Sequence, residues 1–260
     1  MDSSTHKHYH EDGFDSRQCL EHYFSDKSAS VFGEDSLIFP IENLTKTFSE
    51  GHIKGDVLID LSVGPLVHHL FAACDFFNHI IVLKVSDRCI MELKRWVDER
   101  TGAFEWGHAV KLHVDIEEKS YQLEDKEQKV RSALQHVLKC NLEKENIMDP
   151  MVLPPADCII SAWLLDVISK DGDDYMRKLR NFSKLLTPGG HLILFGDLDT
   201  TYYKVGKDTF HMFNYDEDFV RKALTEEGFI IDFCNTKART VVNDLCDCKA
   251  LIFIVAHKKK

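Results

Sequence analysis

Residues 57–65 read Val-Leu-Ile-Asp-Leu-Ser-Val-Gly-Pro and are the stretch of this chain best suited to chemistry. The apolar run predicts a buried strand ending in an acid, and Pro65 is typical of the first turn of a helix. In an open α/β sheet, small ligands bind at such a turn, where backbone N–H groups and a helix N-terminus lie. Here Gly64 is the one residue of the turn without a side chain, because Ser62 and Val63 precede it. The stretch therefore predicts a ligand site with a crowded turn.

The histidines and cysteines do not predict a metal site. The 8 cysteines are scattered, and Cys246 and Cys248 form one Cys-x-Cys pair without the second pair that a zinc site needs. His6, His8 and His10 lie in a polar N-terminal stretch that predicts a mobile end rather than a metal-binding tract. Without a secretory signal, the cysteines are expected to be reduced cytoplasmic thiols.

Composition and charge exclude several classes of protein. A chain of 260 residues with 44% hydrophobic and 29% charged residues is long enough for one large globular domain. The formal net charge of −11 disfavours a nucleic-acid or anionic-membrane partner. No apolar run approaches the roughly 20 residues of a membrane span. We expect a cytoplasmic protein whose ligand is a small molecule.

The elements that must position the turn alternate between strands and helices. After a flexible tail at 1–13, we predict two lid helices at 14–24 and 35–48, within a helical lid over 14–50. A single α/β core spanning 55–260 follows, and its last two strands have no helix between them, which predicts a mostly parallel seven-stranded sheet with an antiparallel edge strand. The expected strands are 57–61, 79–83, 109–114, 158–163, 191–195, 229–234 and 250–256. The expected helices are 65–74, 87–99, 120–140, 173–186 and 216–227, with loops at 196–215 and 235–249.

Short motifs in fixed order give this layout a family resemblance. The chain resembles the nicotinamide, phenylethanolamine, indolethylamine and thioether methyltransferases, a group of class I methyltransferases, and is most similar to the nicotinamide branch. The resemblance covers about residues 14–256. It is carried by Leu20-Glu21 with Tyr23, Gly55-Asp56-Val57-Leu58-Ile59-Asp60, Gly64-Pro65, Ala73-Cys74, Glu92-Leu93 with Trp96, Lys139-Cys140, Leu153-Pro154-Pro155-Ala156-Asp157-Cys158, Leu185-Leu186 with Pro188-Gly189-Gly190, and Tyr202-Tyr203 with Gly206.

The resemblance implies a Rossmann-like class I methyltransferase fold and S-adenosylmethionine as the cofactor. It implies transfer of a methyl group to a nitrogen or sulfur of a small amine, pyridine or thioether acceptor, by a protein expected to be a monomer. Such a reaction needs mainly proximity and alignment in a dry pocket, and a carboxylate to hold or deprotonate an amine.

Carried over residue by residue, the resemblance places the cofactor at ten positions, most of which differ from the family pattern. Lys84 stands where the family has an aspartate for the ribose hydroxyls, and lysine has no acceptor for them. Ser62 and Val63 stand where the family has Gly-Ser, so the turn is bulkier. The ten positions are Phe24, Ser62, Val63, Gly64, His68, Lys84, Cys89, Asn141, Leu142 and Ala162.

The same comparison implies residues that position the acceptor. Cys19 stands at a family tyrosine that spans cofactor and acceptor. The slot of the acceptor-facing aspartate falls on Gly196, so Asp197 or Asp199 is expected to substitute. Thr200 keeps a hydroxyl, and Tyr203 is retained. Asp197 and Tyr203, with Thr200 and Cys19, are therefore the candidate catalytic group.

Two functions of different classes follow. The first is a working methyltransferase with a remodelled site. The second is a non-catalytic descendant with weak or no cofactor binding, retained as a binding or structural protein. A third interpretation takes Lys84 as a phosphate binder, as basic residues near this position accept a 2′-phosphate in dinucleotide-binding folds.

Overall fold

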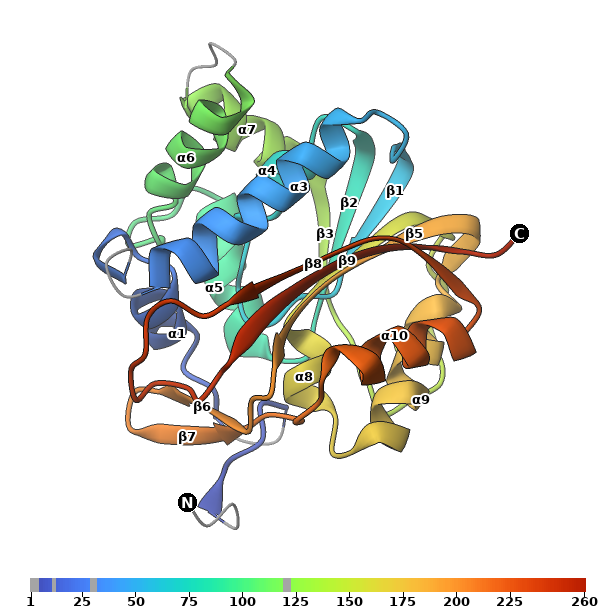
Figure 1. Ribbon diagram of the computed structural model, residues 1–260. Helices are drawn as coiled ribbons and strands as arrows, with labels where there is room; N and C mark the ends of the chain where they lie inside the picture. Colours follow the sequence, from blue (N-terminus) through green and yellow to red (C-terminus); the bar gives the residue numbers. More distant parts are fainter. Residues whose placement is uncertain (1–4, 11–12, 29–31, 119–122) are drawn as a thin grey trace.

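A seven-stranded sheet forms the centre of the computed structural model, which describes residues 5–10, 13–28, 32–118 and 123–260 (Figure 1). Its order is β3-β2-β1-β4-β5-β9-β8, with β9 antiparallel to both of its neighbours and the other neighbouring strands parallel to each other. The predicted mostly parallel sheet with an antiparallel edge is confirmed. The strands are β1 Gly55–Asp60, β2 Phe77–Lys84, β3 Leu134–Lys139, β4 Ala156–Ala162, β5 Leu186–Leu198, β8 Phe229–Ala238 and β9 Ala250–Lys258.

Helices cover both faces of the sheet (Figure 1). One layer holds α3 Phe39–Ser49, α4 Leu70–Ala73, α5 Asp87–Val97, α6 Gly107–Glu117 and α7 Leu123–Ala133. The other holds α8 Leu164–Ile168, α9 Gly172–Ser183 and α10 Glu217–Glu226. Before the sheet come α1 Ser16–Tyr23, the 3₁₀ turn η2 Asp26–Ser28 and the π-helical η3 Gly33–Ile38. The central strands are buried on both faces, which explains why they are continuous apolar runs.

Acidic caps explain where several helices begin. The side chains of Asp15, Asp171 and Asp216 each accept a hydrogen bond from a backbone N–H in the first turn of α1, α9 and α10. Such caps satisfy donors that have no partner inside the helix, and each is typically worth about 1 kcal/mol. These helix starts were readable from the sequence.

The predicted third strand at 109–114 is wrong. Those residues lie in α6, where Ala109, Val110 and His113 are buried at helical spacing. The third strand is instead β3, which pairs with β2 from Leu134 to Lys139, inside the predicted helix 120–140. That helix ends at Ala133, and its expected residues 120–122 lie outside the described part of the chain. Residues 134–139 form a strand because they pair with the edge of β2, which lies far away in the sequence.

Two other expectations differ from the structure. The predicted helix 65–74 is reduced to the four residues of α4, after a turn. The predicted loop 196–215 begins with the end of β5 and contains a small hairpin, β6 Tyr202–Val205 paired with β7 Asp208–His211. The hairpin matters because the N-terminal segment lies against it.

The N-terminal segment, residues 5–10, is packed on the core where the sequence predicts a flexible tail. Lys7 N donates to Thr209 O at 2.8 Å and Lys7 O accepts from His211 N at 2.8 Å, which adds the segment to the edge of β7. Tyr9 is 1% exposed. Figure 1 shows this end of the chain beside β6 and β7.

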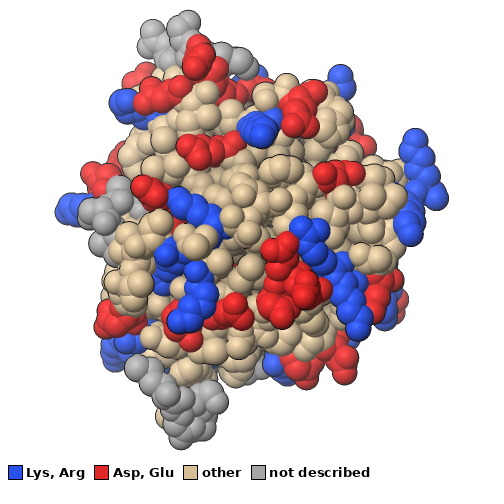
Figure 2. Space-filling model, in the orientation of Figure 1, with Lys and Arg blue, Asp and Glu red and all other residues tan. Residues whose placement is uncertain are grey.

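The surface carries charges of both signs. On the face in Figure 2, acidic and basic side chains are interspersed around a largely uncharged central area rather than gathered by sign. Among the described residues, no helix has the length and apolar character needed to span a bilayer.

Candidate functional site

A buried acid anchors the turn after β1. Asp60 Oδ1 accepts a hydrogen bond from Ser62 Oγ at 2.6 Å and lies 2.7 Å from His69 Nε2, while Lys84 Nζ is 3.7 Å from Oδ2. Burial opposes ionisation, but the charges of His69 and Lys84 hold the pKa of Asp60 below its usual value. These four residues, the Asp60 cluster, are all buried. The acid braces the turn from inside.

Lys84 is directed into the Asp60 cluster. The side chain is 1% exposed, and its ammonium donates to the backbone oxygen of Ser62 at 2.9 Å. The charge is therefore satisfied by the protein itself. This geometry does not support the interpretation of Lys84 as a phosphate binder, because its ammonium is not presented to a ligand.

The backbone N–H groups of the turn have partners within the chain. Val63 N donates to Ala162 O at 2.9 Å, and Gly64 N donates to the hydroxyl of Tyr9 at 2.9 Å. Ser62 Oγ accepts from Ala162 N at 3.1 Å, which ties the turn to β4. Gly64 has a φ of +58°, a conformation that favours glycine.

Tyr9 occupies the position at the turn where a ligand would accept a hydrogen bond. Its ring packs edge-on against Phe14, with centroids 4.8 Å apart, and its hydroxyl lies 3.6 Å from Cys89 Sγ. Burial raises the pKa of Tyr9 well above its usual value, so the phenol stays neutral. Two predicted cofactor positions, Gly64 and Cys89, are thus brought together, but around the chain's own tyrosine.

Two more predicted cofactor positions, Phe24 and His68, pack against each other, with ring centroids 5.1 Å apart. His68 is buried and stacks on Trp106, with centroids 5.5 Å apart. Leu142 is buried, whereas Asn141 is exposed and its Oδ1 accepts from the backbone N–H of Glu143.

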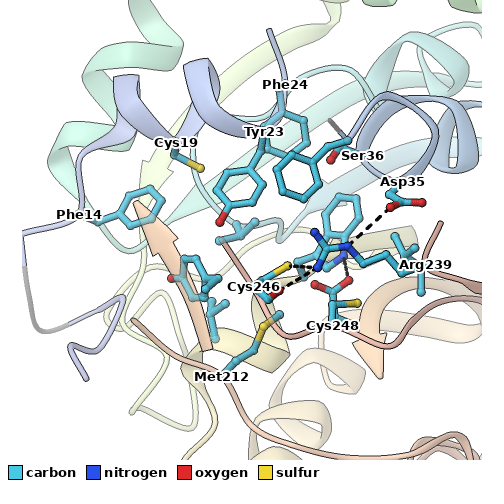
Figure 3. Close-up of a pocket in the computed structure, with 17 residues that line it drawn as sticks. Phe14, Cys19, Tyr23, Phe24, Asp35, Ser36, Met212, Arg239, Cys246 and Cys248 are labelled. Atoms are coloured by element: carbon cyan, nitrogen blue, oxygen red, sulfur yellow. Dashed lines mark hydrogen bonds and ion pairs between the residues drawn. The ribbon is translucent and has the colours of Figure 1, made fainter. Parts of the chain in front are cut away.

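A cavity of about 90 Å³ lies beyond the carboxyl ends of β4 and β5 (Figure 3). This is several times the roughly 10–15 Å³ that one water needs. Its walls are mainly aromatic, aliphatic and sulfur-containing. It is lined by Phe14, Cys19, Tyr23, Phe24, Phe32, Asp35, Ser36, Val63, Trp163, Val167, Asp197, Tyr203, Met212, Arg239, Cys246, Cys248 and Leu251.

Three of the four predicted catalytic residues meet at this cavity: Cys19, Asp197 and Tyr203. Thr200 does not line it, and its hydroxyl donates to Leu198 O at 3.0 Å. Phe24 and Val63, predicted to bind the cofactor, also line the cavity.

Asp197, not position 196, supplies the cavity carboxylate. A Cβ built on Gly196 would lie 2.0 Å from the hydroxyl of Tyr215, so this packing leaves no room for a side chain there. Asp197 Oδ1 accepts from Trp163 Nε1 at 2.9 Å. Desolvation raises the pKa of Asp197 to about 6, which leaves it mostly ionised at neutral pH. Asp199, the other expected substitute, is exposed and does not line the cavity.

Behind Asp197 lies a second buried acid that sequence reasoning missed. Asp166 Oδ1 accepts from the Tyr215 hydroxyl at 2.7 Å, and Oδ2 accepts from the backbone N–H of Asp197 at 2.8 Å. Burial, followed by the charge of Asp197, raises the pKa of Asp166 to about 8. Asp166 therefore positions the backbone of Asp197. Its signal was an acid inside the apolar run 164–168.

Arg239 is the cation of the cavity. Its Nη1 donates to the backbone oxygen of Cys246 at 2.9 Å, and its Nε lies 3.9 Å from Asp35 Oδ2 (Figure 3). Burial raises the pKa of Asp35, and the guanidinium opposes that shift. The cavity lining thus contains two carboxylates, Asp35 and Asp197, and one guanidinium, whose charge opposes the raised pKa of both acids. This balance favours an amine or cationic group over an anion.

Comparison with known proteins agrees with the predicted family. The model of the NNMT/PNMT/TEMT family matches residues 2–259. Nicotinamide N-methyltransferase of Homo sapiens is 33% identical over 245 residues, covering 94% of this chain and 93% of the relative. Indolethylamine N-methyltransferase of Oryctolagus cuniculus is 33% identical over 243 residues, covering 94% and 92%. The chain therefore belongs to the NNMT/PNMT/TEMT family.

Solved structures agree with the predicted fold. A S-adenosylmethionine-dependent methyltransferase from Clostridium acetobutylicum superposes with a TM-score of 0.60 at 11% identity, covering 93% of this chain and 100% of that one. The glycopeptide N-methyltransferase MtfA, solved with S-adenosylmethionine, gives 0.55 at 9% identity, covering 85% and 94%. Family and fold are those of S-adenosylmethionine-dependent N-methyltransferases, and the predicted cofactor agrees with them.

The turn after β1 and the last residue of β2 do not fit that cofactor in this arrangement. Gly64 N is bonded to Tyr9, so it is not available to a ligand. Lys84 presents no acceptor for ribose hydroxyls and is held by the Asp60 cluster. The acceptor side of the site, around Asp197, is open as a cavity. Entry of the cofactor requires the N-terminal segment to leave the turn.

The Asp60 cluster generates a stability prediction. Asp60→Asn leaves the buried Lys84 ammonium without its carboxylate, and breaking a buried pair in this way typically costs about 3–5 kcal/mol. We expect a loss of this order in the free energy of unfolding, measured by urea denaturation. Lys84→Met is the control, because it removes the ammonium while Asp60 keeps its contacts with Ser62 and His69, and it should cost clearly less. Equal costs for the two variants would contradict the pairing.

Asp166 generates a pH prediction. Its folded pKa of about 8 exceeds its usual value, so the folded state binds more protons than the unfolded state between these values. Stability must therefore fall as pH rises toward 8. Between pH 6 and 8 the stability of the unmodified protein should fall by about 1–2 kcal/mol relative to Asp166→Asn. Parallel curves of melting temperature against pH for the two proteins would disprove it.

Proposed function

We propose that this family member takes a small, largely apolar molecule with an amine or pyridine nitrogen into the cavity and acts on it as an N-methyltransferase. S-adenosylmethionine, the family's cofactor, would supply the methyl group. The observation that carries the proposal is the carboxylate of Asp197 in a mainly apolar cavity beside the β1 turn, whose other two charged groups, Asp35 and Arg239, lie 3.9 Å apart. A thioether would fit the walls, but it would make no use of the carboxylate.

Asp197 has the properties needed for a nitrogen acceptor. Attack on a methyl group needs a neutral nitrogen, and a carboxylate with a raised pKa is a better proton acceptor than an ordinary one. The Trp163 hydrogen bond fixes one carboxylate oxygen, and Asp166 holds the backbone. Aromatic walls exclude water and align the ligand. A cytoplasmic monomer without a nucleic-acid partner stays the prediction for the working protein.

A second candidate function is binding of the same kind of molecule without methyl transfer. It is favoured by one observation, which is that the groups of the β1 turn are bonded within the chain. The Gly64 N–H donates to the Tyr9 hydroxyl, and the Lys84 ammonium donates to Ser62 O. Under this alternative the family's cleft is permanently filled by the N-terminal segment. The two candidates differ in whether S-adenosylmethionine can displace Tyr9.

Calorimetric titration with S-adenosylmethionine separates the candidates. We expect the unmodified protein to bind weakly and Tyr9→Ala to bind about tenfold more tightly, because the apparent affinity falls with the fraction of molecules whose site is open. Tyr9→Phe, which keeps the ring but loses the hydroxyl, should lie between them. A variant with Lys84→Asp, Ser62→Gly and Val63→Ser serves as the restored reference. Binding by this reference alone would reject the methyltransferase proposal and support the second candidate.

The carboxylate is tested separately from the cofactor. Asp197→Asn should weaken binding of benzylamine, a small cationic aromatic amine, by about tenfold, the value of one charge-assisted hydrogen bond. Binding to the unmodified protein should also weaken as pH falls through about 6, where Asp197 becomes protonated. Asp199→Asn is the matched control, because Asp199 is exposed two residues away. Unchanged affinity in Asp197→Asn would exclude the carboxylate as the ligand's partner.

A further inference from the structure

Three potential metal ligands from three different strands meet far from the cavity. His191 lies on β5, Asp232 on β8 and His257 on β9. Six residues separate His191 from Asp197 along β5, which is about 20 Å at the usual rise of a strand. We propose that these residues form a site for a divalent transition metal such as Zn²⁺, distinct from the methyltransferase site.

The sheet register brings the two histidines together. His191 and His257 are direct cross-strand partners in the antiparallel β5–β9 pair, so their side chains lie on the same face. Their ring centroids are 5.9 Å apart. Direct pairing on a β-sheet places the two imidazoles without the help of a flexible loop.

A strand irregularity supplies the third ligand. The β8–β9 register shifts between Ile231 and Phe233, which makes Asp232 the extra residue of a bulge. Bulges change the direction of a side chain, and here the carboxylate reaches His257 Nδ1, with Oδ1 at 2.8 Å and Oδ2 at 2.9 Å. One ligand atom from each residue lies within 4.8 Å of the others. Small side-chain rotations would place all three near the 2.0–2.2 Å that zinc requires.

The chemistry of the donors favours a borderline metal. Two imidazole nitrogens and one carboxylate oxygen suit Zn²⁺, and they leave a fourth position for water or another ligand. His52 adds a further imidazole nearby, with its ring centroid 5.8 Å from that of His191.

A bound ion would join the two outer strands to β5. β8 is the edge strand, and it contacts the rest of the sheet through β9. An ion that binds only the folded state raises thermal stability by mass action. The site would therefore act as a clamp on the antiparallel edge.

The test is titration of the full chain with ZnCl₂, by calorimetry and by thermal melting. His6, His8 and His10 are first changed to alanine, because these N-terminal histidines are potential zinc ligands themselves. In this background we expect one Zn²⁺ per chain and a higher melting temperature with zinc. Asp232→Asn and His191→Phe should each weaken binding at least tenfold, while the partly exposed His79→Ala should not.

Three results would overturn the proposal. They are no zinc binding in the background variant, affinity within twofold of the background in both ligand variants, or an equal loss in His79→Ala. Asp232→Asn is an exposed change and is not expected to unfold the protein. If His191→Phe fails to fold, Co²⁺ absorption in the background variant and in Asp232→Asn decides, since removing a ligand must change the spectrum of a bound ion.

Discussion

The rest of the site depends on one buried carboxylate, Asp60, and the cations that surround it. Removing a carboxylate and an ammonium from water is costly unless they are placed close together and hydrogen-bonded. Asp60 ends β1 and Lys84 ends β2, so the pairing fixes the ends of two parallel neighbours. Ser62 and His69 complete the cluster from the turn and the residue before α4. The turn is thus positioned by hydrogen bonds and charge pairing with buried groups on its inner side.

The outer side of the turn is occupied by Tyr9. Lys84 is held by the Asp60 cluster, and Val63 N donates to Ala162 O of β4. Gly64 N instead donates to the hydroxyl of Tyr9. Tyr9 belongs to the N-terminal segment, residues 5–10, which pairs with strand β7 of the small β6–β7 hairpin. The family's cofactor turn, the N-terminal segment and the hairpin therefore form one packed unit.

The acceptor side is organised by a different pair of acids. Asp166 and the Tyr215 hydroxyl occupy the space in which a side chain at position 196 would lie, so Asp197 and not position 196 presents a carboxylate to the cavity. Arg239 reaches the same cavity from the segment after β8. The cavity adjoins the closed turn, because Val63 of the turn lines the cavity and Phe14, another lining residue, packs on Tyr9.

The sequence by itself predicted six of the seven strands of the sheet and helices that match α1, α3, α5, α9 and α10. Buried parallel strands must be apolar runs, and helix starts such as those capped by Asp171 and Asp216 are written locally. The family resemblance predicted Cys19, Asp197, Thr200 and Tyr203 as acceptor-positioning residues, and all of them except Thr200 line the cavity. The strand β3 was missed because the edge of β2, more than 50 residues earlier, selects it.

Tertiary structure alone decided which distant polar groups meet. Nothing near Tyr9 in the sequence indicates that its hydroxyl reaches Gly64, and nothing near His191 indicates a bulged Asp232 or a facing His257. Local patterns encode burial and periodicity, which depend on neighbours within a few residues. Hydrogen bonds and metal ligands between remote strands depend on register and packing, which only the folded chain specifies.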